Sequence, residues 1–143
     1  MADQVPELDN KTRLDWLRLL YQLAHSDIRW AKEQGWRVVN WALLLFAASL
    51  GLYKFLHDVS LWVFALLDAG IGVIAILYLA DLHQFAAVSR DTGSRIQAHM
   101  PKIDDILTHR AWDRNHVAYF VVKVTVVVVS LVLTVLALRY VRS

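Results

Sequence analysis

Two ionisable side chains lie inside long apolar runs of the sequence. Asp68 is set in LWVFALLDAGIGVIAILYLAD (residues 61–81), and Lys123 is set in VAYFVVKVTVVVVSLVLTVLAL (residues 117–138). A charged group at the centre of a membrane-spanning helix costs about 3 kcal/mol on insertion scales, so it usually faces protein or a water-filled path. The two residues therefore indicate either the lining of a pore or contacts between helices.

Depth argues against a salt bridge between Asp68 and Lys123. From the side of the membrane where the third run begins, Asp68 lies roughly 12 residues or about 18 Å deep, and Lys123 roughly 6 residues or about 9 Å. Helical side chains also tilt toward the N-terminus of their own helix, which moves the two groups further apart. We therefore expect no direct pair. Lys123 then either extends its ammonium to the nearby headgroups or belongs to a polar stripe.

Each apolar run carries a stripe of small or polar residues at helical spacing. The stripes are His116, Tyr119, Lys123, Ser130 and Thr134 on the third run; Ala65, Asp68, Ala69, Gly72 and Ala75 on the second; and Asn40, Ala47 and Gly51 on the first. Small residues allow helices to approach closely, and polar ones hydrogen-bond between them. The stripes predict packing within one chain or around the axis of a homo-oligomer. The candidate pore-lining or interhelix residues are Asp68, Gly72, Lys123, Ser130 and Thr134.

A second group of candidate residues is basic and lies outside the apolar runs. Its members are Arg90, Arg95, Lys102, His109, Arg110 and Arg114. His109 shares a face with Asp113 and His116 at a spacing that could hold a metal ion, but the neighbouring arginines favour a hydrated interfacial face. We therefore expect the basic residues to bind a phosphate-bearing ligand or lipid headgroups, and we predict no metal site.

Signals for catalysis and for cofactors are missing from the sequence. The chain has no cysteine, and it contains no glycine-rich phosphate loop, Ser/His/Asp arrangement or HExxH motif. All six histidines lie outside the apolar runs, which argues against a haem held by two histidines between the spans. The net charge of +2 does not favour duplex nucleic acid as a partner. We predict that the protein is not an enzyme and has no cofactor.

The elements that position these residues are predicted to be the helices of a membrane protein. Hydrophobic residues make up 57% of the 143-residue chain and the mean hydropathy is +0.40, which is too apolar for a small soluble domain. We predict an all-α integral membrane protein, one domain with three transmembrane helices. The predicted segments are an amphipathic helix at 12–35, spans at 38–56, 61–80 and 117–138, and further helices at 81–116. Thr12 is expected to cap the first helix and Gly35 to end it.

The distribution of lysine and arginine predicts the orientation. Six such residues lie within residues 1–37 and five within 81–116, whereas the turn after the first span holds only Lys54. By the positive-inside rule, the N-terminus and the 81–116 segment face the cytoplasm. Arg139 and Arg142 then lie on the outer side, which runs against the same rule for the third span.

The layout resembles a class of small bacterial membrane effectors. LRLLYQLAHSDIRWAKEQGWR leads into a hairpin of spans, which continues as YLADLHQFAAVSRDTGSRIQ. Over residues 14–100 this is similar to the SLATT-type transmembrane effectors of anti-phage systems, and in kind to the membrane effector of the Hailong system, although the third span departs from the two-span SLATT pattern. The resemblance implies a homo-oligomeric channel in the bacterial inner membrane that opens on a cytoplasmic nucleotide or oligonucleotide and depolarises the cell. The alternative is a structural or accessory subunit that docks a partner through its cytoplasmic helices.

Overall fold

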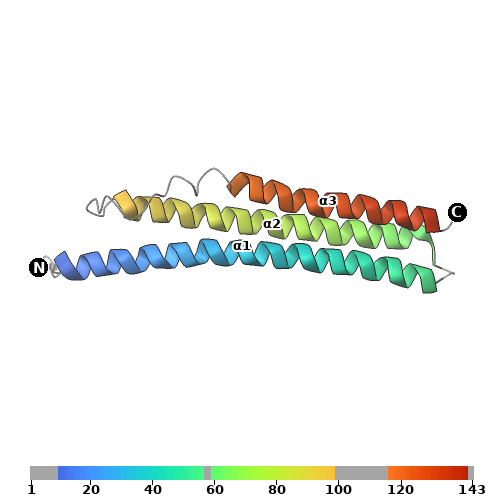
Figure 1. Ribbon diagram of the computed structural model, residues 1–143, viewed down its shortest axis with the longest axis horizontal. Helices are drawn as coiled ribbons and strands as arrows, with labels where there is room; N and C mark the ends of the chain where they lie inside the picture. The colour runs from blue at the N-terminus through green and yellow to red at the C-terminus, as the bar shows by residue number, and fades with distance from the viewer. Residues whose placement is uncertain (1–9, 57–58, 99–115, 142–143) are drawn as a thin grey trace, which may run out of the picture.

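The computed structural model describes residues 10–56, 59–98 and 116–141, and all regular secondary structure within these ranges is helical. The helices are α1 (Asn10–Phe55), α2 (Leu61–Ala98) and α3 (His116–Val141). They form one elongated bundle in which α2 runs antiparallel to α1 and α3 (Figure 1). Each helix is long and apolar enough to cross a membrane. The predicted all-α class with three helices of spanning length is therefore confirmed.

Unequal helix lengths divide the bundle into two parts. At 1.5 Å per residue, α1 is about 69 Å long, α2 about 57 Å and α3 about 39 Å, against a bilayer core of about 30 Å. At the end that holds the N-terminus, α1 and α2 continue beyond the start of α3 (Figure 1). We call residues 10–30 of α1 and 87–98 of α2 the two-helix extension, and the remainder the three-helix part. The three-helix part alone is long enough to span a bilayer.

One uninterrupted helix covers the two segments predicted at 12–35 and 38–56, so the boundary expected at Gly35 is wrong. Glycine disfavours a helix by about 1 kcal/mol relative to alanine, but Gly35 is buried against neighbouring helices, and this packing outweighs the weak local preference. The helix also begins at Asn10, so Thr12 lies inside it rather than at its cap. α2 runs without a break through the predicted 61–80 span to Ala98. The helix expected to start at Pro101 lies outside the described residues.

Small residues bring α1 and α2 close together along most of their length. The facing pairs are Ala24–Gly93, Ala31–Ala86, Ala42–Ala75 and Ser49–Asp68. On each helix the four positions are separated by steps of seven, eleven and seven residues. Steps of seven and eleven keep one face of a helix turned toward the same neighbour. Because the steps match in antiparallel order, each of these four residues of α1 meets its counterpart on α2.

α3 completes the three-helix part by packing on both other helices. Val127 is fully buried in the central core with Phe46 of α1 and Leu79 of α2. A second core near the α1–α2 turn holds Tyr53, Phe64 and Leu138. These contacts fix the height of α3 relative to its neighbours.

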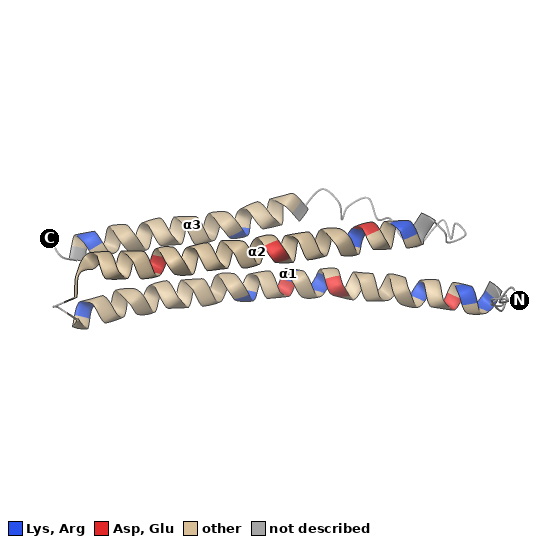
Figure 2. Cartoon of the chain, turned by 180° about the vertical axis from the view of Figure 1, so that it is seen from behind, with Lys and Arg blue, Asp and Glu red and all other residues tan. Residues whose placement is uncertain are grey.

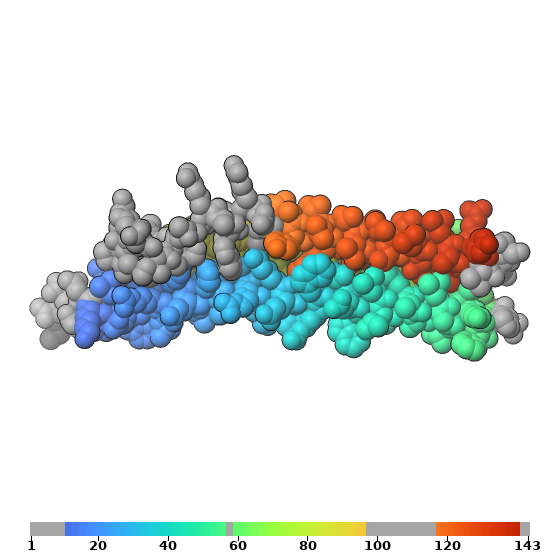
Figure 3. Space-filling view, in the orientation of Figure 1, coloured from blue at the N-terminus to red at the C-terminus, as the bar shows by residue number. Residues whose placement is uncertain are grey.

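The outside of the three-helix part is apolar. In the most apolar window of each helix, only 22–28% of the window is buried inside the protein. Trp62, Leu66 and Ile74 of α2 are 73%, 71% and 68% exposed. Charged residues are concentrated toward the two-helix extension, and they are sparse on the rest of the bundle (Figure 2). Where α1 and α3 lie in contact in the space-filling view (Figure 3), their outward side chains form a surface suited to acyl chains.

The close α1–α2 contact predicts that enlarging a small residue inside it destabilises the bundle. Ala31→Leu should lower the free energy of unfolding by about 1–3 kcal/mol, because added methyl groups force the helices apart. Ala47→Leu, on the exposed side of α1, is the matched control and should change the same quantity by less than about 0.5 kcal/mol. Denaturation of both variants in one detergent, followed by circular dichroism, measures the difference. Equal stability of the two variants would contradict the close packing.

Candidate functional site

A buried carboxyl group lies inside the three-helix part, between the central core and the core near the α1–α2 turn. Asp68 is 0% exposed, and its partner Ser49 on α1 is 2% exposed. The Ser49 hydroxyl donates a hydrogen bond to Asp68 Oδ2 at 3.1 Å. Asp68 Oδ1 is also buried, and it receives no hydrogen bond from the described residues. One half of the carboxyl group is therefore satisfied and the other half is not.

Thr134 of α3 lies at the same height as Asp68. Gly72 packs against Leu131 on one side of this level: a Cβ added at Gly72 would lie 3.1 Å from Leu131 Cδ2. Phe64 and Leu138 share a core on the other side. Because α2 and α3 are antiparallel, Asp68 and Thr134 both fall midway between these contacts, and Thr134 is only 6% exposed. We call Ser49, Asp68 and Thr134, one residue from each helix, the polar layer.

The polar layer contains hydrogen-bond acceptors, on Asp68 and Thr134, that receive no hydrogen bond from the described residues. The Thr134 hydroxyl donates to the carbonyl of Ser130 in its own helix at 2.8 Å, which leaves its oxygen free to accept. An unsatisfied buried acceptor costs about 1–3 kcal/mol. Water or a cation would each satisfy Asp68 Oδ1. The layer is thus suited to interact with small polar species that enter the bundle, and it contains no nucleophile–base arrangement.

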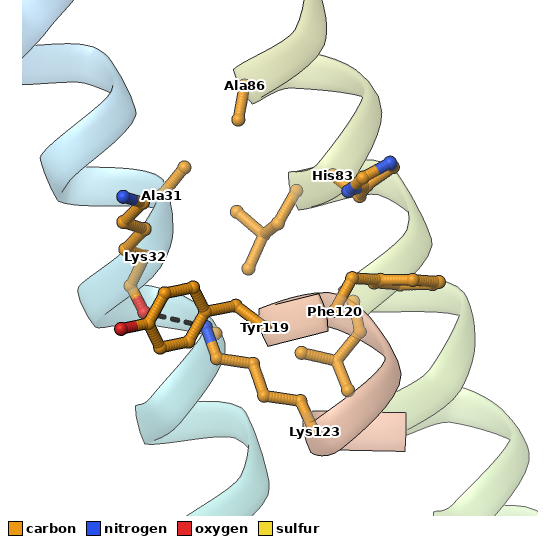
Figure 4. A pocket seen from close by; sticks show the side chains of 10 residues that line it. Ala31, Lys32, His83, Ala86, Tyr119, Phe120 and Lys123 are labelled. Atoms are coloured by element: carbon orange, nitrogen blue, oxygen red, sulfur yellow. Dashed lines mark hydrogen bonds between the residues drawn. The ribbon is translucent and has the colours of Figure 1, made fainter. Parts of the chain in front are cut away.

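Lys123 forms a second polar centre nearer the two-helix extension. It is only 6% exposed, and its ammonium donates to the backbone carbonyl of Lys32 on α1 at 2.9 Å (Figure 4). The ammonium also lies 5.4 Å from the centroid of the Trp36 ring. Lys123 therefore points away from the polar layer and does not pair with Asp68, in line with the expectation from their depths.

The ammonium can reach the α1 backbone because Gly35 has no side chain. A Cβ added at Gly35 would lie 2.5 Å from Lys123 Nζ and 3.3 Å from its Cε. Real Cβ atoms do not tolerate the shorter approach, so any larger residue would displace the lysine. Gly35 leaves the space that the end of the Lys123 side chain occupies, which we call the seat of Lys123. It has this role instead of the helix-ending role predicted for it.

Several residues around Lys123 line a small cavity between the three helices. We call this cavity the basic pocket; its lining residues include Lys32, His83, Tyr119, Phe120 and Lys123. In Figure 4, Lys123 crosses from α3 to α1, Tyr119 lies alongside Lys32, and His83 stands beside Phe120 on the α2 side. Lys32 Nζ lies 5.6 Å from the centroid of the Tyr119 ring. Two lysines from different helices therefore converge on one wall.

The other predicted site residues are spread over the bundle. Gly72 is buried, Ser130 is half-buried beside the polar layer, and Arg90 is half-buried with its Nε donating to the carbonyl of Ala86 at 2.9 Å. Arg95 forms an exposed ion pair with Asp91 at 2.8 Å, a kind of contact that contributes little stability. Four further predicted residues lie outside the described residues: Lys102, His109, Arg110 and Arg114. The His109–Asp113–His116 spacing lies there with them.

Sequence reasoning missed Ser49, Lys32 and the role of Gly35. It placed the small stripe of α1 at Asn40, Ala47 and Gly51, and these residues do share a face, but all three are exposed on the outside of the bundle. The signal for Ser49 is its place in the series of seven- and eleven-residue steps that matches the series of α2. No local signal identifies Lys32, because its backbone carbonyl rather than its side chain receives Lys123.

A pair of glycine substitutions tests the seat of Lys123. Gly35→Ala should lower the free energy of unfolding by about 1 kcal/mol, because a lost charged hydrogen bond of about 1.5–3 kcal/mol outweighs the helix gain of about 1 kcal/mol. Gly51→Ala is the control: its Cβ would meet nothing within 4 Å, so it should stabilise by up to about 1 kcal/mol. Unfolding in detergent measures both variants.

A third variant isolates the lysine. In a Lys123→Met background the side chain no longer competes for the space at Gly35, so Gly35→Ala should cease to be destabilising. If Gly35→Ala and Gly51→Ala have the same effect in the unaltered chain, the assignment of Gly35 as the seat of Lys123 is wrong.

The described part of the chain thus holds two buried polar centres, the polar layer and the basic pocket, inside a bundle with an apolar exterior. The polar layer can accept hydrogen bonds or a cation, and the basic pocket carries the positive charges of two lysines. Compared with known proteins, the chain matches no family model, no curated protein and no solved structure.

Proposed function

We propose that the protein is a ligand-gated membrane pore that assembles from several copies of this chain. The observation that carries the proposal is the polar layer: a buried carboxyl group with one unsatisfied oxygen inside a bundle of spanning length. A helix bundle that needed only to be held together would not require such a group, since apolar residues of similar size pack without the desolvation cost. The described arrangement is then the closed one.

Opening would relieve the cost of this burial. Water that enters the layer supplies the hydrogen bond that Asp68 Oδ1 does not receive from the described residues. The negative charge would favour cations in the open path. Thr134 and Ser49 would line the same level with hydroxyl groups, and Lys123 would lie closer to the end of the pore with the extension.

The two-helix extension supports self-assembly. Large apolar side chains are exposed there, although the segment lies beyond the most apolar part of α1: Trp16 is 58% exposed, Leu19 56% and Leu23 55%. Exposed apolar patches outside a bilayer usually mark contacts with protein. In the proposed assembly, extensions of neighbouring copies pack side by side and hold the spans around a common axis.

The cytoplasmic placement of the extension is part of the same proposal. It rests on the lysines and arginines of residues 1–37 and 81–116. With that orientation, a ligand that binds the basic residues arrives from the cytoplasm of a bacterial cell. The anti-phage role, with a nucleotide signal and depolarisation of the inner membrane, enters the proposal through the resemblance to SLATT-type effectors.

Substitution of Asp68 tests the pore directly. Purified protein should give a defined oligomer by mass in detergent, and the same sample should conduct ions in a planar bilayer once nucleotides are added. Asp68→Asn, which removes the charge and keeps the shape, should lower unitary cation conductance or selectivity without changing the oligomer mass. Asp81→Asn, an exposed residue on the same helix, is the matched control and should conduct as the unaltered chain does.

The contrary result is also well defined. If Asp68→Asn reduces the fraction of protein that assembles while the conductance of each assembled complex is unchanged, Asp68 serves packing and the permeation path avoids it. A purified oligomer that never conducts, with or without added nucleotides, would refute the proposal that the protein is a pore.

A structural or accessory subunit is the second candidate. The same exposed Trp16, Leu19 and Leu23 favour it, because they would equally cover a partner's helices. A monomer in detergent, with no current, would favour this function over the pore.

A further inference from the structure

The basic pocket lies at the height of lipid headgroups. Its lining residues Ala31, His83 and Tyr119 lie close to the start of α3, where the three-helix part meets the two-helix extension. Trp36 and Tyr119 border it and are 42% and 48% exposed. Half-exposed tryptophan and tyrosine at the end of an apolar span are typical of the membrane–water interface. A ligand at this height meets both the aqueous phase and the headgroup layer.

Positive charge dominates the pocket. Among the described residues that line it, Lys32, His83 and Lys123 are basic and none is acidic. An anion is attracted to the ammonium groups of Lys32 and Lys123, which both line the cavity.

The geometry of Lys123 leaves donors for an anion. An ammonium has three N–H groups, and one of those of Lys123 is used on the Lys32 carbonyl. The side chain is 6% exposed and seated against Gly35, so its position is fixed before a ligand arrives. The Tyr119 hydroxyl, on the wall shared with Lys32 (Figure 4), adds a further donor. Fixed donors bind more tightly because less freedom is lost on binding.

The size of the cavity limits what enters it. The cavity has a volume of about 30 Å³, which is room for about two waters. The rest of the wall is apolar, with Ala31, Leu79 and Leu82 among its members. A whole nucleotide does not fit, whereas the oxygens of a phosphate group fit at the mouth with the remainder of the molecule outside.

We propose that the basic pocket binds the phosphate group of a lipid headgroup or of a small soluble phosphate, held by Lys32, Lys123 and the Tyr119 hydroxyl. Arg90 adds positive charge at the edge of the site. The headgroup layer and the cytoplasm supply the same chemistry at this height. A ligand bound between α1 and α3 acts on the two helices that also carry Ser49 and Thr134, so the site would gate the pore. This gating role rests on the proposed function.

Two arms of one experiment distinguish the sources of phosphate. In the first, the full chain in neutral detergent is titrated with phosphatidylglycerol and, as a phosphate-free comparison, with diacylglycerol of the same acyl chains, and binding is followed by native mass spectrometry. In the second, lipid is omitted and inorganic phosphate or glycerol phosphate is added, with thermal stability as the readout. Saturable binding in the first arm alone identifies the lipid, and a saturable rise in melting temperature in the second identifies the soluble phosphate.

Lysine variants tie the binding to the pocket. Lys32→Met and Lys123→Met should each weaken phosphate binding by about tenfold or more, since each removes a charged hydrogen bond. Lys32 is only half-buried, so its variant should fold even if Lys123→Met does not. Lys54→Met, exposed at the far end of α1, is the control and should bind as the unaltered chain does.

Two results would overturn the site: equal binding of phosphatidylglycerol and diacylglycerol with no response to soluble phosphate, or unchanged phosphate binding in Lys32→Met. Current recordings on the same preparations separate this site from the pore. Phosphate binding without any current would support the phosphate site and refute the pore. Current without phosphate binding would support the pore and refute the phosphate site.

Discussion

A bilayer core offers no water to polar side chains, so each polar group placed there needs a partner within the protein. Asp68 and Lys123 meet this constraint in the same way, by bonding to α1: one to the Ser49 hydroxyl and the other to the Lys32 carbonyl. Both bonds require backbones that lie close together. The matched small residues of α1 and α2 and the bare backbone at Gly35 provide that closeness.

The two polar centres are linked through the same helices. α1 carries the partners of both charged residues, and α3 carries Lys123 at one height and Thr134 at another. In the proposed function, an anion that pulls on Lys123 changes the contact of α3 with α1, and the displacement reaches the polar layer because the packed core between them contains Val127 and Phe46. A rigid helix transmits such a shift more readily than side chains alone.

Much of the fold follows from the apolar runs, whose length identifies three helices, and from the chain between Asp81 and Pro101, which contains no helix-breaking proline. The continuity of α1 does not follow, because burial of Gly35 between helices outweighs a local preference that favours an end. The inner face of α1 also does not follow from its own sequence. Asn40, Ala47 and Gly51 form a stripe of small and polar residues, and only comparison with α2 shows that Ala42 and Ser49 face inward. The seat of Lys123 depends on residues far apart in sequence.

Access of water to the polar layer is the central claim, and one introduced thiol measures it. The chain has no cysteine, so Ser49→Cys provides a single reactive group, and Ala47→Cys on the exposed face of α1 serves as its control. A charged, membrane-impermeant methanethiosulfonate is applied in a planar bilayer while current is recorded. We predict that the thiol at position 49 is modified, with a change in current, only while the channels conduct. Steady current with that thiol unmodified would contradict the account, because ions would then cross the membrane without passing Asp68.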